Sequence, residues 1–195
     1  DDYNAFPFPI SDGQRRPQFS MVADPMNIEL NRLQLRYQAK DLALTLGRQR
    51  IILDDQRWVG AAAWRQNEQT FDAARAEPKL GPVSLDAAYA LGQRTVFGID
   101  AGLRQAFEGD FVLLGAGVKA GPVALKTFAY LLDYDEAFFA ANSSQTYGIR
   151  ATSSLPLGSG TNLNLAASYA RQSGYGSNPF EYSADYASLQ ASLVA

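Results

Sequence analysis

Apolar and polar residues alternate along most of the chain. In residues 31–39, Leu35 and Tyr37 lie on one set of alternate positions, and Arg32 and Arg36 lie on the other. A period of two predicts a β-strand with one apolar and one polar face. The same alternation recurs and predicts nine strands, at about 28–39, 42–51, 69–79, 82–95, 110–120, 123–134, 144–157, 162–172 and 181–193. Residues 123–131 alternate less cleanly, and we expect a bulge there.

The connections between these strands are alternately short and long. The short ones carry Gly and Pro, as hairpin turns do, and recur about every 40 residues: Lys40-Asp41, Gly81-Pro82, Gly121-Pro122 and 158–160. The long ones cover about 52–68, 96–109, 135–143 and 173–181. This alternation is typical of outer-membrane barrels. The sequence therefore predicts an all-β fold, an antiparallel up-and-down transmembrane β-barrel, with residues 1–195 as one domain and 1–27 as an outer loop segment.

The two faces of the predicted strands differ in a way that favours a membrane. One face carries Leu, Val, Ile and Ala, with Tyr near the strand ends (Tyr37, Tyr89, Tyr147 and Tyr169). This composition suits contact with outer-membrane lipid and an aromatic girdle. The alternative is a soluble β-sandwich or binding module, whose turns would recur about every 8–12 residues throughout. The regular long connections fit that alternative poorly.

Nine strands are an incomplete set for a membrane barrel. Bacterial single-chain barrels have even strand numbers, and an open sheet leaves two unpaired edges that the hydrocarbon core does not tolerate. We therefore expect the chain to be a fragment of a larger barrel of about 16–18 strands.

Composition excludes several kinds of chemistry. The chain has no Cys and no His, and its formal net charge is −3. Thiolate metal sites and His-dependent catalysis are therefore absent, and no nucleic-acid partner is indicated. Asp133 and Asp135 could act as a glycosidase pair, but they adjoin a solvated loop, so we predict no enzyme and no cofactor. Asp24, Asp54 and Asp55 match no recognised metal loop, so no metal site is predicted.

Residues 22–76 resemble the alginate-export family of Gram-negative outer-membrane porins. The resemblance lies in VADPMNIELNRLQLRY (22–37), LTLGRQRI (44–51) and DDQRWVGAAAWRQNEQTFDAAR (54–75). The matching positions are Ala23, Asp24, Pro25, Asn31, Gly47, Arg48, Gln49, Arg57, Val59, Gly60, Trp64, Phe71, Asp72, Ala73 and Arg75. The resemblance implies an outer-membrane barrel of about 18 strands that passes an anionic polysaccharide or small solutes.

A set of basic residues is expected to line the pore and to select anions. These are Arg32, Arg36, Arg48, Arg94, Lys119 and Arg150, with Lys126 less well defined by the pattern. A ring of cations between low-dielectric walls focuses a positive potential. Alternatively, these cations pair with acids across strands and stiffen the wall. Strict alternation would place Arg48 on the lipid face with Leu46. Arg48 must then lie above the hydrocarbon, or a bulge near Gly47 turns it into the lumen.

The long connection 52–67 can fold into the barrel as a constriction. It carries Trp58 and Trp64, whose rings could stack on sugars, and Arg57 and Arg65, which could bind carboxylates. Alternatively, both tryptophans anchor the chain at the membrane interface.

The expected function is a passive outer-membrane channel for anionic solutes, with export of an anionic exopolysaccharide such as alginate as one role. Its partners would be membrane lipid, an anionic oligo- or polysaccharide and other export-machinery proteins. Two alternatives are a general porin for small solutes and a receptor or adhesin scaffold, which the tyrosine-rich loop 174–182 suggests.

Overall fold

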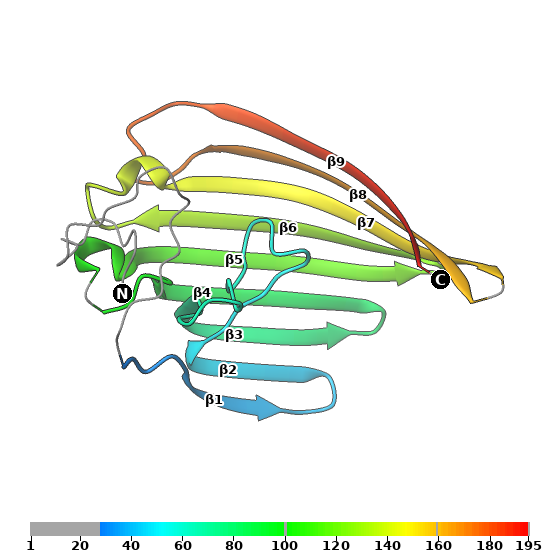
Figure 1. Cartoon of the computed structure of the whole chain (residues 1–195), viewed down its shortest axis with the longest axis horizontal. Coiled ribbons are helices and arrows are strands. Elements are labelled where there is room, and N and C mark those ends of the chain that lie inside the picture. Colours follow the sequence, from blue (N-terminus) through cyan, green and yellow to red (C-terminus); the bar gives the residue numbers. More distant parts are fainter. Residues whose placement is uncertain (1–27, 100, 159, 195) are drawn as a thin grey trace, which may run out of the picture.

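The computed structural model describes residues 28–99, 101–158 and 160–194, and they form one antiparallel sheet (Figure 1). The nine strands are β1 (Leu33–Gln38), β2 (Leu42–Gln49), β3 (Thr70–Leu80), β4 (Val83–Arg94), β5 (Ala106–Ala120), β6 (Val123–Tyr134), β7 (Ser144–Gly158), β8 (Thr161–Gly174) and β9 (Ser183–Val194). Each strand pairs with its neighbours in sequence, so the order is β1 to β9 without crossovers. The predicted all-β, up-and-down antiparallel arrangement is confirmed. The outer loop predicted at 1–27 lies outside the described residues.

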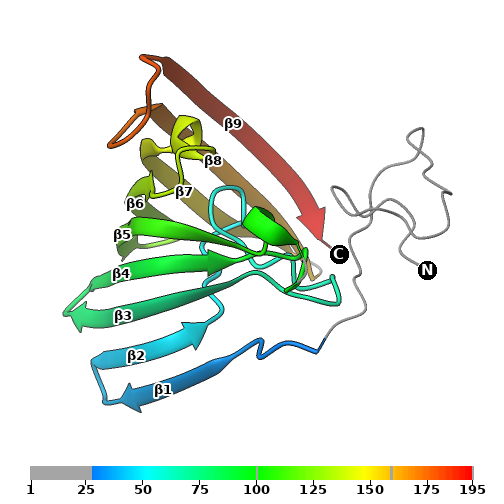
Figure 2. The same ribbon diagram turned by 90° about the vertical axis from the view of Figure 1, so that its left-hand side faces the viewer.

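The sheet is curved into a trough, and the connection between β2 and β3 lies on its concave side (Figure 2). We call the concave side the inner face and the convex side the outer face. Within the described residues, β1 and β9 form the two edges of the sheet.

Tight turns lie at one end of the trough and the long connections at the other. Gly81 and Gly121 have φ of +60° and +59°, and each precedes a proline. Hairpin turns of the primed types need such a positive φ, which Gly adopts without strain. The long connections include the 3₁₀ turns η1 (Gly102–Arg104) and η2 (Ala140–Asn142). No helix in the described part of the chain is long and apolar enough to cross a membrane.

The bulge predicted within 123–131 is wrong. β6 pairs in unbroken register with both β5 and β7. The pattern looked irregular because Phe128 and Tyr130 are bulky residues on the inner face, where they are buried against the connection from β2. Register shifts occur instead between Ala90 and Gly92 of β4 against β3, between Glu108 and Phe111 of β5 against β4, and near Pro156 in β7.

The outer face is apolar and exposed. Leu35 and Leu46 are 76% and 63% exposed, and small alanines between such residues leave a hollow of about 650 Å³. Near the long-connection end, the Tyr89 hydroxyl donates to Asp110, and the Tyr169 hydroxyl donates to Asp185 at 2.6 Å.

The buried core lies on the inner face, between the strands and the β2–β3 connection. Ile51, Leu53 and Val59 of the connection pack with buried inner residues of the wall, including Phe111 and Leu113. In the part of the chain that the structure describes, this cover lies on the inner face alone, and equally apolar residues of the outer face remain exposed.

Candidate functional site

The connection from Arg50 to Gln69, which we call the inner loop, is fixed at its base by a buried carboxylate. Glu68 is 7% exposed, and it accepts ion pairs from Arg32 Nε at 2.9 Å and Arg50 Nη1 at 3.1 Å. Asn31 Nδ2 also donates to Glu68 at 3.1 Å. A buried charge needs such partners, so Glu68 holds both ends of the inner loop to the residues before β1.

Aromatic rings hold the middle of the inner loop against the wall. Trp58 lies edge-on to Tyr186 of β9, with centroids 5.5 Å apart, and 6.5 Å from Phe128 of β6. The Arg57 guanidinium lies over the Tyr186 ring at 5.0 Å. The Phe128 ring occupies the space above Gly148, where an added Cβ would lie 2.2 Å from it. Glycine at this position therefore makes room for the aromatic contact.

Two adjacent aspartates of the inner loop pair with two cations of the wall. Asp54 Oδ1 lies 3.0 Å from Lys126 Nζ of β6, and Asp55 Oδ2 lies 2.9 Å from Arg150 Nη1 of β7. Arg150 Nη1 also donates to Ser168 Oγ of β8 at 2.9 Å. The inner loop thus crosses the inner face and reaches strands far from its own.

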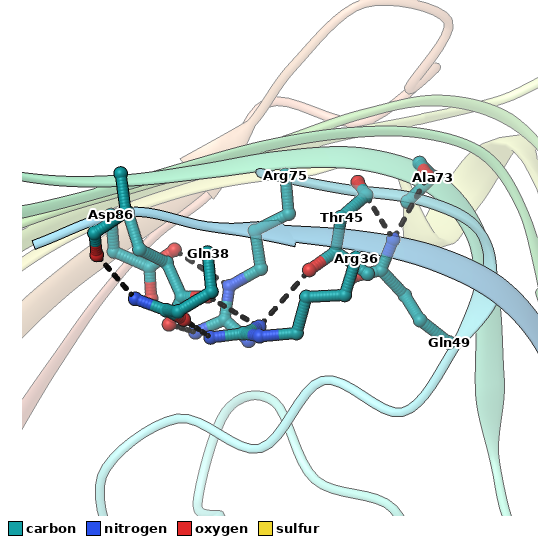
Figure 3. A network of polar contacts seen from close by, with 9 residues as sticks. Arg36, Gln38, Thr45, Gln49, Ala73, Arg75 and Asp86 are labelled. Atoms are coloured by element: carbon teal, nitrogen blue, oxygen red, sulfur yellow. Dashed lines mark hydrogen bonds and ion pairs between the residues drawn. The ribbon is translucent and has the colours of Figure 1, made fainter. Parts of the chain in front are cut away.

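A second set of charges belongs to the wall alone (Figure 3). Arg36 Nη1 lies 3.1 Å from Glu77 Oε2, and Glu77 Oε1 lies 3.3 Å from Arg75 Nη2. Arg75 then donates two hydrogen bonds to Asp86, at 2.8 and 2.6 Å. This charge ladder (Arg36, Glu77, Arg75 and Asp86) joins β1, β3 and β4, and its two cations balance its two acids. The predicted alternative, in which cations pair across strands, describes these residues.

A basic groove lies between the inner loop and the tight-turn end. It has a volume of about 510 Å³, and its charged lining residues are Asp54, Lys79, Lys119, Lys126 and Arg150. A polar hollow of about 450 Å³ adjoins it at Lys119 and is lined by Asn164, Gln190 and Ser192. No acid of the described residues lies within ion-pair distance of Lys79 or Lys119. The groove therefore offers uncompensated positive charge and hydroxyl or amide groups, which suit a hydroxylated anion.

Three of the predicted pore residues lie on the inner face. Arg36 belongs to the charge ladder, Arg150 pairs with the inner loop, and Lys119 lines the basic groove. Arg32 lies at the long-connection end, where it is paired with Glu68. The structure therefore brings Arg150 and Lys119 together and leaves Arg32 and Arg36 elsewhere.

Arg48 does not turn inward, contrary to its prediction as a pore-lining residue. It lies opposite Leu33 and Asp72 in unbroken register, so Arg48 is on the outer face of the sheet, as Leu46 is. Its guanidinium donates to both oxygens of Asp72, at 2.8 and 2.9 Å. Gly47 has a φ of +107°, but the pairing on both sides of β2 continues unshifted. Neutralisation by Asp72 is what allows an arginine at this outer position.

Arg94 is also displaced from the predicted inner position. The bulge after Ala90 shifts the register by one residue, so Arg94 lies opposite Thr70 on the side of Asp72. With the Gln105 amide oriented to suit its neighbours, Arg94 Nη1 donates to the Gln105 oxygen at 2.8 Å. Strict alternation fails here because one extra residue in a strand reverses the facing of all later ones.

The two tryptophans of the inner loop differ. Trp58 is packed against wall aromatics, which contradicts an anchoring role at the membrane interface. Trp64 is 75% exposed, and the Arg65 guanidinium lies over its ring at 4.1 Å. Trp64 and Arg65 thus remain a pair that could contact a sugar. Asp24 lies outside the described residues.

The sequence reasoning missed Lys79, Arg75 and Glu77. Alternation from the buried Phe71 through Ala73 places all three on the inner face of β3. That signal was weakened because the opposite positions of β3 hold small alanines, so neither face looked strongly apolar.

Comparisons with known proteins agree with this architecture. A sequence profile of the family described as alginate export matches residues 14–181. Similar solved structures include OpdL from Pseudomonas aeruginosa, with 20% identity and a TM-score of 0.57 over 82% of this chain and 43% of that one. A BenF-like porin from Pseudomonas fluorescens Pf-5 has 15% identity and a TM-score of 0.60 over 82% and 41%. OpdQ from Pseudomonas aeruginosa has 16% identity and a TM-score of 0.58 over 83% and 45%.

The chain thus spans less than half the length of these solved structures. A comparison with curated proteins finds no match.

Proposed function

The chain belongs to the alginate export family, and from this premise we propose that its nine strands form part of the wall of an outer-membrane channel for anionic solutes. The family and the porin fold confirm the predicted bacterial outer-membrane location. The exposed apolar outer face is the surface that meets membrane lipid.

Among the described residues, β1 and β9 each have a neighbouring strand on one side only, which supports the idea that more strands complete the wall. Unpaired strand edges are not tolerated in hydrocarbon, because their backbone groups would lack hydrogen-bond partners. The similar porin structures are more than twice as long as the matched part of this chain. The trough would then be one side of a closed barrel, with the inner loop narrowing its lumen.

The basic groove carries the proposal of anion preference. Lys79 and Lys119 line the groove beside Lys126 and Arg150. Asp54 and Asp55 offset Lys126 and Arg150, and Lys79 and Lys119 have no acidic partner among the described residues. A unit charge at about 7 Å in water changes the local anion concentration by about threefold. An acidic polysaccharide strand, such as alginate, is one anion that would be drawn into this groove, and the neighbouring Asn164 and Gln190 could bind its hydroxyl groups.

Reversal potentials in planar bilayers test this function. The full protein that carries this chain should prefer anions under a salt gradient, and Lys119→Gln should reduce that preference. Arg171→Gln is the matched control, because Arg171 lies opposite Tyr147 and Asp185 on the outer face and the substitution removes the same charge. A preference that is absent, or that responds equally to both substitutions, would refute the proposal.

A general porin for small solutes is the second candidate. The charge ladder favours it, because the balanced charges of Arg36, Glu77, Arg75 and Asp86 give that part of the lumen no net sign. Liposome swelling separates the two functions. A general porin would admit neutral sugars and uronate oligomers of equal size at similar rates, whereas an anion channel would admit the uronates faster.

A further inference from the structure

Two cations of the inner face lie directly opposite each other. Lys126 of β6 and Arg150 of β7 are Cα partners in the sheet, and both side chains are on the inner side. Like charges at directly opposed positions repel each other and destabilise a sheet. The arrangement therefore needs negative charge close to both side chains.

The anion in the structure is supplied by the inner loop. Asp54 and Asp55 bind Lys126 and Arg150, across sequence separations of 72 and 95 residues. Two consecutive aspartates of the inner loop thus contact two neighbouring cations of the wall. None of the four side chains is more than 29% exposed, yet each retains some contact with water. Because water reaches both pairs, a dissolved anion can compete with these two carboxylates.

The backbone of the inner loop is strained where the two acids lie. Asp54 and Gln56 have φ of +52° and +61°, a region that residues with a side chain rarely adopt. Strain of this kind persists only where surrounding contacts hold it, and it gathers at functional sites.

The paired cations also border the basic groove. Lys126, Arg150 and Asp54 line the same groove as Lys79 and Lys119, the two lining cations that have no acidic partner among the described residues. An anion held by Lys79 and Lys119 would therefore lie beside the pairs that the inner loop occupies.

We propose that Lys126 and Arg150 form a binding site for closely spaced carboxylates, and that Asp54 and Asp55 occupy this site as an internal ligand. A solute with several carboxylates displaces the two aspartates and loosens the inner loop. The inference rests on the proposed function only for the route by which the solute arrives.

Current block in planar bilayers is the first test. Two probes are used, a tetramer of galacturonate and a tetra-aspartate peptide, with neutral maltotetraose for comparison. Asp54→Asn with Asp55→Asn removes the internal competitor, whose tethering gives it a high local concentration, so both acidic probes should block about tenfold more tightly. Adding Lys126→Gln and Arg150→Gln should abolish that gain.

The matched control removes two negative charges elsewhere. Asp41 lies in the exposed β1–β2 turn and Glu181 in the connection before β9. Asp41→Asn with Glu181→Gln should leave the block as it is in the unmodified protein. The inference is overturned if the Asp54 and Asp55 substitutions do not tighten the block, or if the control tightens it equally.

A second measurement does not depend on conduction. Both tryptophans of this chain lie in the inner loop. The difference in tryptophan fluorescence between the unmodified protein and Trp58→Phe is the emission of Trp58, which reports on that loop. In the detergent-solubilised protein, tetragalacturonate should shift this emission to longer wavelength, and the shift should saturate as its concentration rises. Maltotetraose should cause no shift. A saturating shift in a channel without anion preference would refute the proposed function and leave this inference standing. Anion preference with neither an emission shift nor tighter block would support the proposed function and refute this inference.

Discussion

Two arginine–aspartate pairs of the inner face can be compared. Arg75 of β3 pairs with Asp86 of β4, so both partners belong to the wall, whereas Arg150 of β7 pairs with Asp55 of the inner loop. The distances are similar, 2.6 and 2.9 Å, and the exposure of the two arginine side chains is 15% and 18%. The difference lies in what must move for each pair to separate. Arg75 and Asp86 are held by paired strands, so they separate only when the sheet opens. Arg150 and Asp55 separate when one connection moves.

The two arginine–aspartate pairs are chemically alike, but they differ in which part of the chain must move to separate them. The charge ladder joins β1, β3 and β4 and carries no net charge, whereas the pairs with the inner loop would exchange their acids for those of a solute. A prediction from residue type alone would place all of these arginines in a single ring of pore-lining cations.

The largest expected effect comes from breaking the charge ladder. Asp86→Ala removes two hydrogen bonds to Arg75 and leaves it only Glu77, so the free energy of unfolding should fall by about 2–3 kcal/mol. Asp55→Ala should cost less than about 1 kcal/mol, because the freed Arg150 keeps Ser168 and the inner loop can adjust. Urea unfolding in micelles measures both. Equal losses would remove the distinction between the two pairs.

The second prediction concerns the attachment of the inner loop. Trp58→Ala deletes the contacts with Tyr186 and Phe128, and should lower the free energy of loop release by about 2 kcal/mol. Hydrogen exchange of the loop amides measures this release. Trp64→Ala is the matched control in the same loop, and should change exchange little because Trp64 is 75% exposed. Faster exchange in the Trp64 variant would contradict the packing described for Trp58.

A third substitution acts on the same contact from the wall. A methyl group at position 148 would lie 2.2 Å from the Phe128 ring, which stacks on Tyr130 with centroids 4.7 Å apart. Gly148→Ala should therefore displace the ring and cost about 1 kcal/mol of stability, with faster loop exchange. The additional change Phe128→Leu should restore part of the loss, since the ring is then gone. No recovery would mean that Gly148 serves the backbone and not the ring.

The fold was predictable because two strong signals agree. Period-two alternation located nine strands, and the alternate short and long connections fixed their order. The resemblance in residues 22–76 named the family that the profile match over 14–181 confirms. The bulge in β4 was not visible, because Leu91 and Gly92 continue an ordinary pattern while the register with β3 shifts. Because of that shift, strict alternation predicts the wrong face of the sheet for Arg94.

The site was only partly predictable. The sequence indicated that 52–67 could enter the lumen and that Arg150 and Lys119 face it. It could not show that Asp54 and Asp55 meet Lys126 and Arg150, because these contacts join positions 72 and 95 residues apart. No local pattern encodes such a contact. The role of Lys79 was hidden for another reason, since the alanines of β3 weaken the alternation that places it.

The smallest expected effect tests whether balanced and unbalanced charges differ. Arg36→Gln with Glu77→Gln removes one charge of each sign from the exposed end of the charge ladder, where the side chains are 44% and 30% exposed. Such a pair contributes little, so stability should change by less than about 0.5 kcal/mol and the reversal potential should stay the same. Lys79→Gln with Lys119→Gln removes two charges of one sign, and should lower anion preference with equally little loss of stability. If the first double variant also lowered anion preference, the charge ladder would act on solutes and not only within the wall.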